Sequence, residues 1–272
     1  MLPQITLPSL AQKKLDNLGT DCADRCLDPA HFANYPHTVQ YCFNSRGFRD
    51  QEWPDNKDDL EQAVWCVGDG FTLGIGVPLE HSWPWLLQQS LDRRCINVSM
   101  DGASNTWISR TAQAISQALP NATVIVHWTD IQRREMTVSD ALPGKWDRFY
   151  QTVKDHNWPP CGYQQRDQLP QPIKSEIQHC HGWQDLVFDD DRIILHTSFS
   201  LEENLANHAY CVSVLPSQTI QSGPNWVANF ATTDMGMITI AQLDTARDGR
   251  HYDCDTAQQL VSKLASAINS RS

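Results

Sequence analysis

The stretch Val67-Gly68-Asp69-Gly70-Phe71-Thr72-Leu73-Gly74-Ile75-Gly76-Val77-Pro78 decides the fold of this chain. An apolar run of strand length, Ala63–Val67, leads into it, and Ser82–Trp85, with a proline placed to open a helix, follows it. The glycines let the backbone turn tightly and approach a ligand closely. A strand, a glycine-rich turn and a helix in this order hold a nucleophile at the end of a parallel strand. The position for that nucleophile is Gly70, which has no side chain.

The rest of the chain alternates between strand-like and helix-like segments. The apolar pattern predicts strands over 63–67, 95–99 and 122–128, and helices over 82–91 and 105–119. Strands that alternate with helices in this way are typical of an α/β domain with a parallel sheet and helices on both faces. Ligands bind such sheets at the carboxyl ends of the strands. The segments that follow the three strands are therefore expected to converge on one site.

The later part of the chain has weaker patterns. Residues 183–190 and 202–209 are expected to be helical, 211–215 to form a fourth strand and 237–243 the last strand. Asp255 is the expected N-cap of the final helix, which carries apolar residues on one face.

Composition places the chain among globular proteins and limits its partners. It has 272 residues, 40% of them hydrophobic, and a net charge of -11, which disfavours nucleic acid and anionic membrane surfaces. No apolar run approaches the roughly 20 residues of a membrane span. Residues 1–10 show no signal peptide, so a cytoplasmic location is expected. The nine cysteines are expected to be reduced thiols there.

Four short segments share an order and a spacing. They are Gly68–Val77, Met100–Asn105, Val124–Asp130 and Ala246–Tyr252, the last with the pattern D-x-x-H. Together they resemble the blocks of the SGNH (GDSL-type) hydrolases, whose first block reads G-D-S-x-T-x-G-x-G. The resemblance covers about residues 40–270. It implies a flavodoxin-like three-layer α/β/α sandwich and an esterase or lipase-like activity on acyl or acetyl esters, carbohydrate esters included.

The last block supplies a candidate acid and base. An ester hydrolase needs a base to take a proton from the nucleophile and a carboxylate to orient that base. His251 is the candidate base, and Asp248, three residues upstream, can accept a hydrogen bond from its second ring nitrogen. The resemblance implies the same roles for these two residues.

The other blocks supply candidate donors for the oxyanion, with two departures from the family. The backbone N–H groups of Gly70 and Gly102 need no particular side chain for this role. Thr129 stands where the family has asparagine and adds a shorter-reaching hydroxyl donor. His127 replaces the glycine of the same block.

Gly70 itself stands where the family has its serine, and three explanations remain open. The serine was replaced by design to trap a substrate, or the natural protein is a pseudoenzyme that kept the pocket. In the third explanation another group attacks, such as Ser104, Thr72 or a water activated by His251.

Polar residues beside the blocks are candidates for contact with substrate. They are Asp69, Asn105 and Asp130, although Asn105 is favoured as the cap of the following helix. Arg133-Arg134-Glu135 follows the third block. One of its two arginines is a candidate for contact with an anionic or sugar substrate, and a surface ion pair is the favoured interpretation.

No metal or cofactor is expected. His179-Cys180-His181 and the pair Cys22 and Cys26 lack the spacing of a zinc site and are read as buried or loop residues. The run Asp189-Asp190-Asp191 is read as a solvated helix end.

The domain plan and two functions complete the prediction. Residues 1–60 are expected to be an N-terminal extension that packs on a domain over 61–272, with an inserted lid or wall region at about 140–225. The first function is hydrolysis of a small-molecule or glycan ester. The second is a catalytically silent ligand-binding or virion structural protein. The lead-in Asn44–Arg49 and the string from Trp128 to Glu135 resemble phage-encoded members of the family, which favours the second.

Overall fold

The main sheet determines the architecture. The computed structural model describes residues 5–8, 10–24, 26–35, 37–137, 164–165, 185–189, 192–196, 200–228 and 237–271. Within them, five strands form the main sheet: β3 (Val64–Gly68), β4 (Cys95–Ser99), β5 (Thr123–His127), β10 (Ile220–Pro224) and β11 (Ile238–Ile240). All neighbours are parallel, in the order β11-β10-β5-β3-β4. Numbered along the chain this is 2-1-3-4-5, the flavodoxin-like order, and it confirms the predicted fold class.

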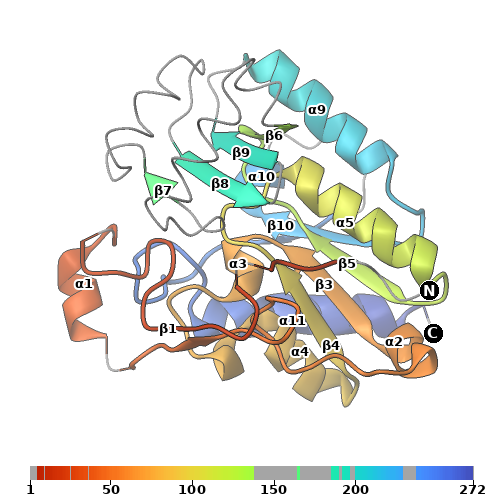
Figure 1. The fold of residues 1–272 in the computed structure, drawn as a ribbon, viewed down its shortest axis with the longest axis horizontal. Helices are drawn as coiled ribbons and strands as arrows, with labels where there is room; N and C mark the ends of the chain where they lie inside the picture. The colour runs from red at the N-terminus through yellow and green to blue at the C-terminus, as the bar shows by residue number, and fades with distance from the viewer. Residues whose placement is uncertain are drawn as a thin grey trace.

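Helices cover both faces of the sheet, and β3 shows why. Its residues alternate between two hydrophobic clusters, with Trp65 and Val67 in one and Val64 and Cys66 in the other. The covering helices are α5 (Asn105–Ala118) and α9 (Leu201–Ser213) on one face, and α4 (Trp83–Leu91) and α11 (Cys254–Asn269) on the other (Figure 1). Because both faces are buried, the residues of β3 are apolar throughout rather than alternating.

The segment before β3 contributes to the same core. It contains the short antiparallel strands β1 (Lys14–Leu15) and β2 (Tyr41–Cys42) and the helices α1 (Pro29–Asn34) and α2 (Lys57–Gln62). Leu7, Tyr41 and Phe48 are buried in the cluster that α5 covers. The domain boundary at residues 60 and 61 stays a prediction.

A small antiparallel sheet follows the third core strand. Its order is β6-β9-β8-β7, from β6 (Arg133–Thr137), β7 (Gln164–Gln165), β8 (Asp185–Asp189) and β9 (Arg192–His196). The predicted helix over 183–190 is therefore wrong, because most of that range is β8, paired with β9. The same pairing places Asp189 in a strand rather than at a helix end. The triplet 179–181 lies outside the described residues, and the role of this region as a lid stays a prediction.

Two further predictions from the later part of the chain are wrong. Residues 211–215 do not form a strand, because α9 extends to Ser213 from a capping box between Ser200 and Glu203. The fourth strand is β10 instead. The final helix is capped by Asp253 rather than Asp255, since the Asp253 side chain accepts hydrogen bonds from the backbone N–H groups that open α11.

Candidate active site

The glycine-rich stretch forms a tight turn at the carboxyl end of β3. Asp69 caps the short helix α3 (Gly70–Leu73), its side chain accepting a hydrogen bond of 3.1 Å from the Phe71 N–H. Gly74 ends that helix with a φ of 79°, a backbone conformation that favours glycine. Gly70 is therefore the first residue of α3, where a backbone N–H has no partner within the helix.

A buried arginine holds this turn. The Arg49 guanidinium donates hydrogen bonds of 3.2 Å to the Leu73 carbonyl and 2.9 Å to the Val77 carbonyl, and it lies over the Tyr41 ring. Arg49 is 1% exposed. The lead-in to the first block therefore fixes the turn through an arginine as well as through the packing of Phe48.

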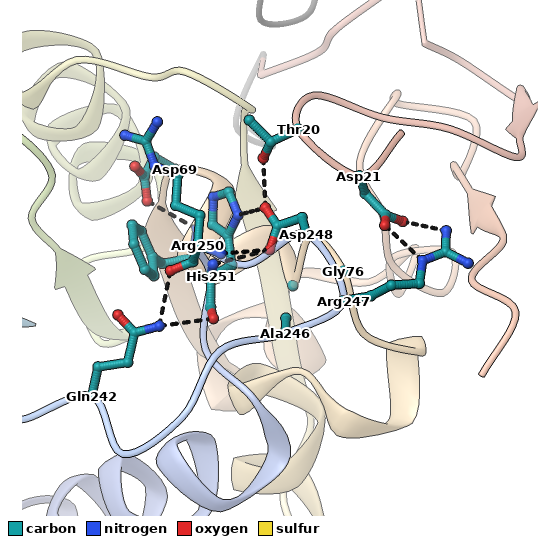
Figure 2. A network of polar contacts seen from close by, with 12 residues as sticks. Thr20, Asp21, Asp69, Gly76, Gln242, Ala246, Arg247, Asp248, Arg250 and His251 are labelled. Carbon is teal, nitrogen blue, oxygen red and sulfur yellow. Dashed lines mark hydrogen bonds and ion pairs between the residues drawn. The ribbon is translucent and has the colours of Figure 1, made fainter. Parts of the chain in front are cut away.

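Asp248 and His251 form a complete acid–base pair. The His251 Nδ1 lies 2.6 Å from the Asp248 Oδ2, and the backbone N–H groups of Arg250 and His251 each lie 3.1 Å from Oδ1 (Figure 2). The Thr20 hydroxyl donates a further hydrogen bond of 2.5 Å to Oδ2. Burial alone raises the pKa of the Asp248 carboxyl. The charge of His251 and these hydrogen bonds outweigh burial and hold that pKa well below its usual range.

The loop that carries this pair is fixed from both sides. The Gln242 side chain donates to the carbonyls of Arg250 and His251 at 2.9 and 3.0 Å (Figure 2). The Arg247 N–H donates to the Gly76 carbonyl at 3.2 Å, which docks the loop on the glycine-rich stretch. A Cβ on Gly76 would lie 2.8 Å from the Ala246 Cβ, so this approach requires glycine.

The His251 ring occupies the space in which a residue 70 side chain would begin. A Cβ placed on Gly70 would lie 2.5 Å from the His251 Nε2 and 3.0 Å from the Ile75 Cδ1. Phe71 packs against the imidazole as well, with ring centroids 4.6 Å apart. The base nitrogen therefore points at the backbone of Gly70, and a serine there requires the imidazole to move.

A small polar cavity adjoins His251. Its volume is about 10 Å³, which is the space of about one water molecule. The residues that line it are Thr20, Asp69, Gly70, Asp101, Arg133, Arg250 and His251. Residues from the first and last blocks thus meet at one point, together with Thr20 from the N-terminal segment.

Asp69, Thr129 and Arg133 form a buried network behind the cavity. The Asp69 Oδ2 accepts hydrogen bonds from the Thr129 hydroxyl and, at 2.8 Å, from the Arg133 Nη1. The expected oxyanion role of Thr129 is therefore wrong, because its hydroxyl proton is directed at Asp69. The expected surface ion pair of Arg133 is also wrong, since its side chain is only 7% exposed. Burial opposes the charge of Arg133, but the nearby carboxylates, Asp69 foremost, outweigh it and raise the pKa of the guanidinium.

Asn105 orients the Thr129 backbone. Its side-chain oxygen accepts from the Thr129 N–H at 2.9 Å, and its amide nitrogen donates to the Thr129 carbonyl at 3.1 Å. Ser104, not Asn105, caps α5, through a hydrogen bond from the Trp107 N–H. Asn105 is 1% exposed, so its contacts are with the chain rather than with the cavity.

The remaining predicted site residues lie around this centre. Gly102 follows β4 with a φ of 71°, in a turn closed by a hydrogen bond from the Ala103 N–H to the Met100 carbonyl. Its oxyanion role stays a prediction. Asp130 accepts a hydrogen bond from the Trp226 indole at 3.2 Å and pairs with Arg250 at 3.4 Å. Its side chain is 28% exposed, so it lies on the rim.

His127 belongs to the core, not to the cavity. Its Nδ1 lies 2.9 Å from the Ser222 hydroxyl and its Nε2 lies 3.2 Å from the Tyr252 hydroxyl. Burial lowers the pKa of this imidazole to about 4. The ring is therefore neutral over most of the pH range.

The two alternative hydroxyl nucleophiles do not line the cavity. Ser104 is fully buried as the cap of α5. The hydroxyl of Thr72 fills the space beside Gly68, where an added Cβ would lie 2.0 Å from it. Thr20 does line the cavity, but its hydroxyl donates to Asp248.

The part of the chain that the structure describes contains neither a metal-ligating cluster nor a membrane-spanning helix. Its cysteines, including Cys22 and Cys26, are free thiols. No group of three or more His, Cys, Asp or Glu side chains in these residues could hold a metal ion. Among the described helices, none is long and apolar enough to cross a membrane.

Two residues of this centre, Thr20 and Arg49, were not assigned to it from the sequence. Thr20 lies in a segment without a periodic pattern. Arg49 ends the lead-in to the first block, whose resemblance to the family does not show that this side chain binds the turn. Arg133 had a signal, because it follows the third block at a spacing that resembles the family. Its burial depends on Asp69, which is 64 positions away.

Comparisons with known proteins concern the fold alone. No protein-family model matches the chain, and no curated protein matches it significantly. Similar solved structures include a psychrotrophic esterase from Pseudoalteromonas sp., at 12% identity and a TM-score of 0.41 over 77% of this chain and 97% of that one. They also include a carbohydrate acetylesterase from Sinorhizobium meliloti (12% identity, TM-score 0.35, 78% of this chain and 100% of that one) and a family 3 carbohydrate esterase from Clostridium thermocellum (9%, 0.36, 76% and 98%). In strand order and in the order of its four blocks, the chain resembles the SGNH (GDSL-type) hydrolases.

Proposed function

We propose that this chain is an SGNH-like ester hydrolase in which a water molecule takes the place of the missing serine. One observation carries the proposal: the complete Asp248–His251 pair adjoins a cavity of one water's size at Gly70. The substrate class is a small-molecule or glycan ester.

The reaction needs one base and one oxyanion site. The oxygen of the cavity water attacks the ester carbonyl carbon while His251 Nε2 takes a proton from that water. The carbonyl π electrons move to the oxygen, which the N–H groups of Gly70 and Gly102 stabilise. When the tetrahedral intermediate collapses, the C–O bond to the alcohol breaks and the imidazolium returns its proton to the leaving oxygen. The products are a carboxylic acid and an alcohol.

Asp248 serves this cycle through its charge and its position. Its carboxylate fixes the tautomer that carries the proton on Nδ1, so that Nε2 is the free base. It also stabilises the imidazolium formed after proton transfer. Without a covalent step the rate is expected to be low, because the serine and histidine of such sites act as a unit worth about 10⁶-fold.

A second candidate is a catalytically silent ligand-binding protein. The observation that favours it is the position of His251, whose ring occupies the space of the absent side chain. In that case the Asp248–His251 pair would be a structural link between the last loop and the glycine-rich turn.

Hydrolysis of 4-nitrophenyl acetate separates the two candidates. We expect slow turnover by the unmodified chain and a loss of about 10²-fold in His251→Ala, the usual contribution of a general base. Asp248→Asn should lower the rate as well, because it disturbs the tautomer. Equal rates in the unmodified chain and His251→Ala, or no turnover in either, would favour the silent protein.

A further inference from the structure

The oxyanion site of the proposed reaction lacks its expected third donor. The family uses an asparagine amide in the third block, and Thr129 stands there instead. The Thr129 hydroxyl donates to Asp69 and is itself 2.8 Å from the Arg133 Nη1. Two backbone N–H groups then remain for the negative charge that develops when water attacks.

Arg133 has hydrogen-bond donors to spare at this point. Its Nη1 binds Asp69 and Thr129 at 2.8 Å each, and lies 3.4 Å from the Ala103 carbonyl. Its Nη2 lies 3.8 Å from the Asp130 Oδ2, which is too long for a hydrogen bond. None of the described residues accepts a hydrogen bond from Nη2 or Nε. The side chain is 7% exposed, and it lines the same cavity as Gly70 and His251.

The ion pair with Asp69 fixes this guanidinium. Asp69 is fully buried and caps α3, so the carboxylate that holds Nη1 is attached to the turn that presents Gly70. Thr129, which also contacts Nη1, is held through its backbone by Asn105. The spare N–H groups therefore have a fixed position relative to the base, which is the condition for stabilising a transition state.

We propose that Arg133 is a catalytic residue whose spare guanidinium N–H groups bind the oxyanion in place of the missing asparagine amide. This rests on the proposed function. A charged donor forms hydrogen bonds roughly twice as strong as those of a neutral amide. The exchange of a neutral amide for a cation thus partly offsets the loss of the serine, since water attack places the same negative charge on the carbonyl oxygen.

Arg250 is the competing cation. It lines the same cavity and pairs with Asp130 at 3.4 Å. Its side chain is 26% exposed, so water screens its charge more than that of Arg133. The proposal therefore requires a larger effect from Arg133 than from Arg250.

Two measurements test the assignment, one of which needs no turnover. The first is calorimetric binding of methylphosphonate, a tetrahedral anion that resembles the intermediate, to the unmodified chain. The second is ester hydrolysis, with kcat and KM measured separately, in the unmodified chain and in Gly70→Ser. The variants are Arg133→Gln, Arg133→Lys and Arg250→Gln. Arg271→Gln is the charge control, because Arg271 contacts the Gln218 carbonyl at the far end of the sheet.

We expect Arg133→Gln to lower kcat by about 10²-fold with little change in KM, as for loss of one oxyanion donor. Methylphosphonate affinity should fall at least about 10-fold, and Arg133→Lys should recover part of both losses. Arg133→Gln leaves the Asp69 carboxylate buried without its ion-pair partner. The double variant Asp69→Asn/Arg133→Gln is therefore measured as well. It should recover the stability lost in Arg133→Gln and should still lack both properties.

Three outcomes would overturn the assignment: unchanged methylphosphonate affinity in Arg133→Gln, no binding by the unmodified chain, or a larger loss in Arg250→Gln. If no form of the chain hydrolyses an ester, the proposed function fails. Anion binding that depends on Arg133 would then still support this residue as the anion donor of the pocket.

Discussion

The two halves of the candidate site differ in how complete they are. The base half, on the loop after β11, holds Asp248 with four hydrogen bonds, from His251 Nδ1, the Thr20 hydroxyl and two backbone N–H groups. The nucleophile half, after β3 and β5, has a glycine in place of a serine and the buried pair Asp69–Arg133.

The difference separates two kinds of requirement. A base must be oriented and its partner kept charged, and every contact of Asp248 does one or the other. A nucleophile need not come from the chain when water fits beside the base. Under the proposed function, the chain therefore supplies an oriented base for a water molecule and no side chain for covalent catalysis at residue 70.

Restoring the serine should have the largest effect. Gly70→Ser is expected to raise the rate of ester hydrolysis by about 10³-fold, because it returns a nucleophile to an intact base. The imidazole must first move, since the new Cβ begins 2.5 Å from Nε2. Steady-state rates on 4-nitrophenyl acetate measure the gain.

Gly70→Ala is the matched control, because it adds the same Cβ without the hydroxyl. Gly70→Ala should hydrolyse the ester more slowly than the unmodified chain, because the added Cβ displaces the imidazole from the cavity water. A gain in Gly70→Ser that survives His251→Ala would show that the base half is not used.

The buried pair of the nucleophile half should dominate its stability. Asp69→Asn leaves the Arg133 charge buried without its partner, which costs about 3 kcal/mol of unfolding free energy. Urea unfolding of Asp69→Asn and of Asp69→Asn/Arg133→Gln measures this loss of unfolding free energy. If the double variant is no more stable than the single one, the two side chains are not coupled.

His127 should make stability depend on pH. The pKa of the folded imidazole is about 4, below its unfolded value of about 6.5, so the unfolded chain binds an extra proton between these values. Stability from this group is therefore full above about pH 6.5 and falls by about 2 kcal/mol by about pH 5.

Urea unfolding of the unmodified chain and of His127→Gln, each at about pH 6.5 and about pH 5, isolates this effect. Burial raises the pKa of the Asp50 carboxyl to about 6, and Arg94 opposes this shift. Asp50 therefore titrates in the same pH range, but it does so in both chains. Equal pH dependence in the two chains would mean that His127 is accessible to protons in the folded state.

Thr20 should have the smallest effect and the most specific one. Thr20→Val removes the hydroxyl that donates to Asp248 and keeps the shape, at a cost of about 1.5 kcal/mol in stability. Thr20→Val should also lower the rate of ester hydrolysis, and Thr20→Ser should restore both the stability and that rate. A rate unchanged in Thr20→Val would show that the Asp248 position does not depend on the N-terminal segment.

Much of the fold could be predicted from local pattern. The strands that became β3, β4 and β5 are apolar runs bounded by turn residues, and their burial on both faces explains that pattern. The strand β10 was missed, because Ile220–Pro224 contains a glycine and a proline and has no apolar run. The apolar residues just before it belong to the end of α9 instead.

The contacts of the site were predictable only where the residues are close in sequence or belong to the four blocks. Asp248 and His251 are three positions apart, and their pairing follows from the pattern. Thr20 lies 228 positions from Asp248, and the Asp69–Arg133 pair spans 64, so only the folded chain brings them together. Thr129 lies 60 positions from Asp69, which likewise explains why its hydroxyl was expected to bind the oxyanion rather than Asp69.

The most direct test of water attack is the intact mass of the chain during turnover. Samples with 4-nitrophenyl butyrate are quenched in acid while 4-nitrophenol is still being released, with Gly70→Ser as the positive control. With water as the nucleophile, we expect an acyl adduct on Gly70→Ser and an unmodified mass for the chain with Gly70, although both release 4-nitrophenol in a manner that needs His251. An acyl adduct on the chain with Gly70 would rule out water attack, because a side chain would then be the nucleophile.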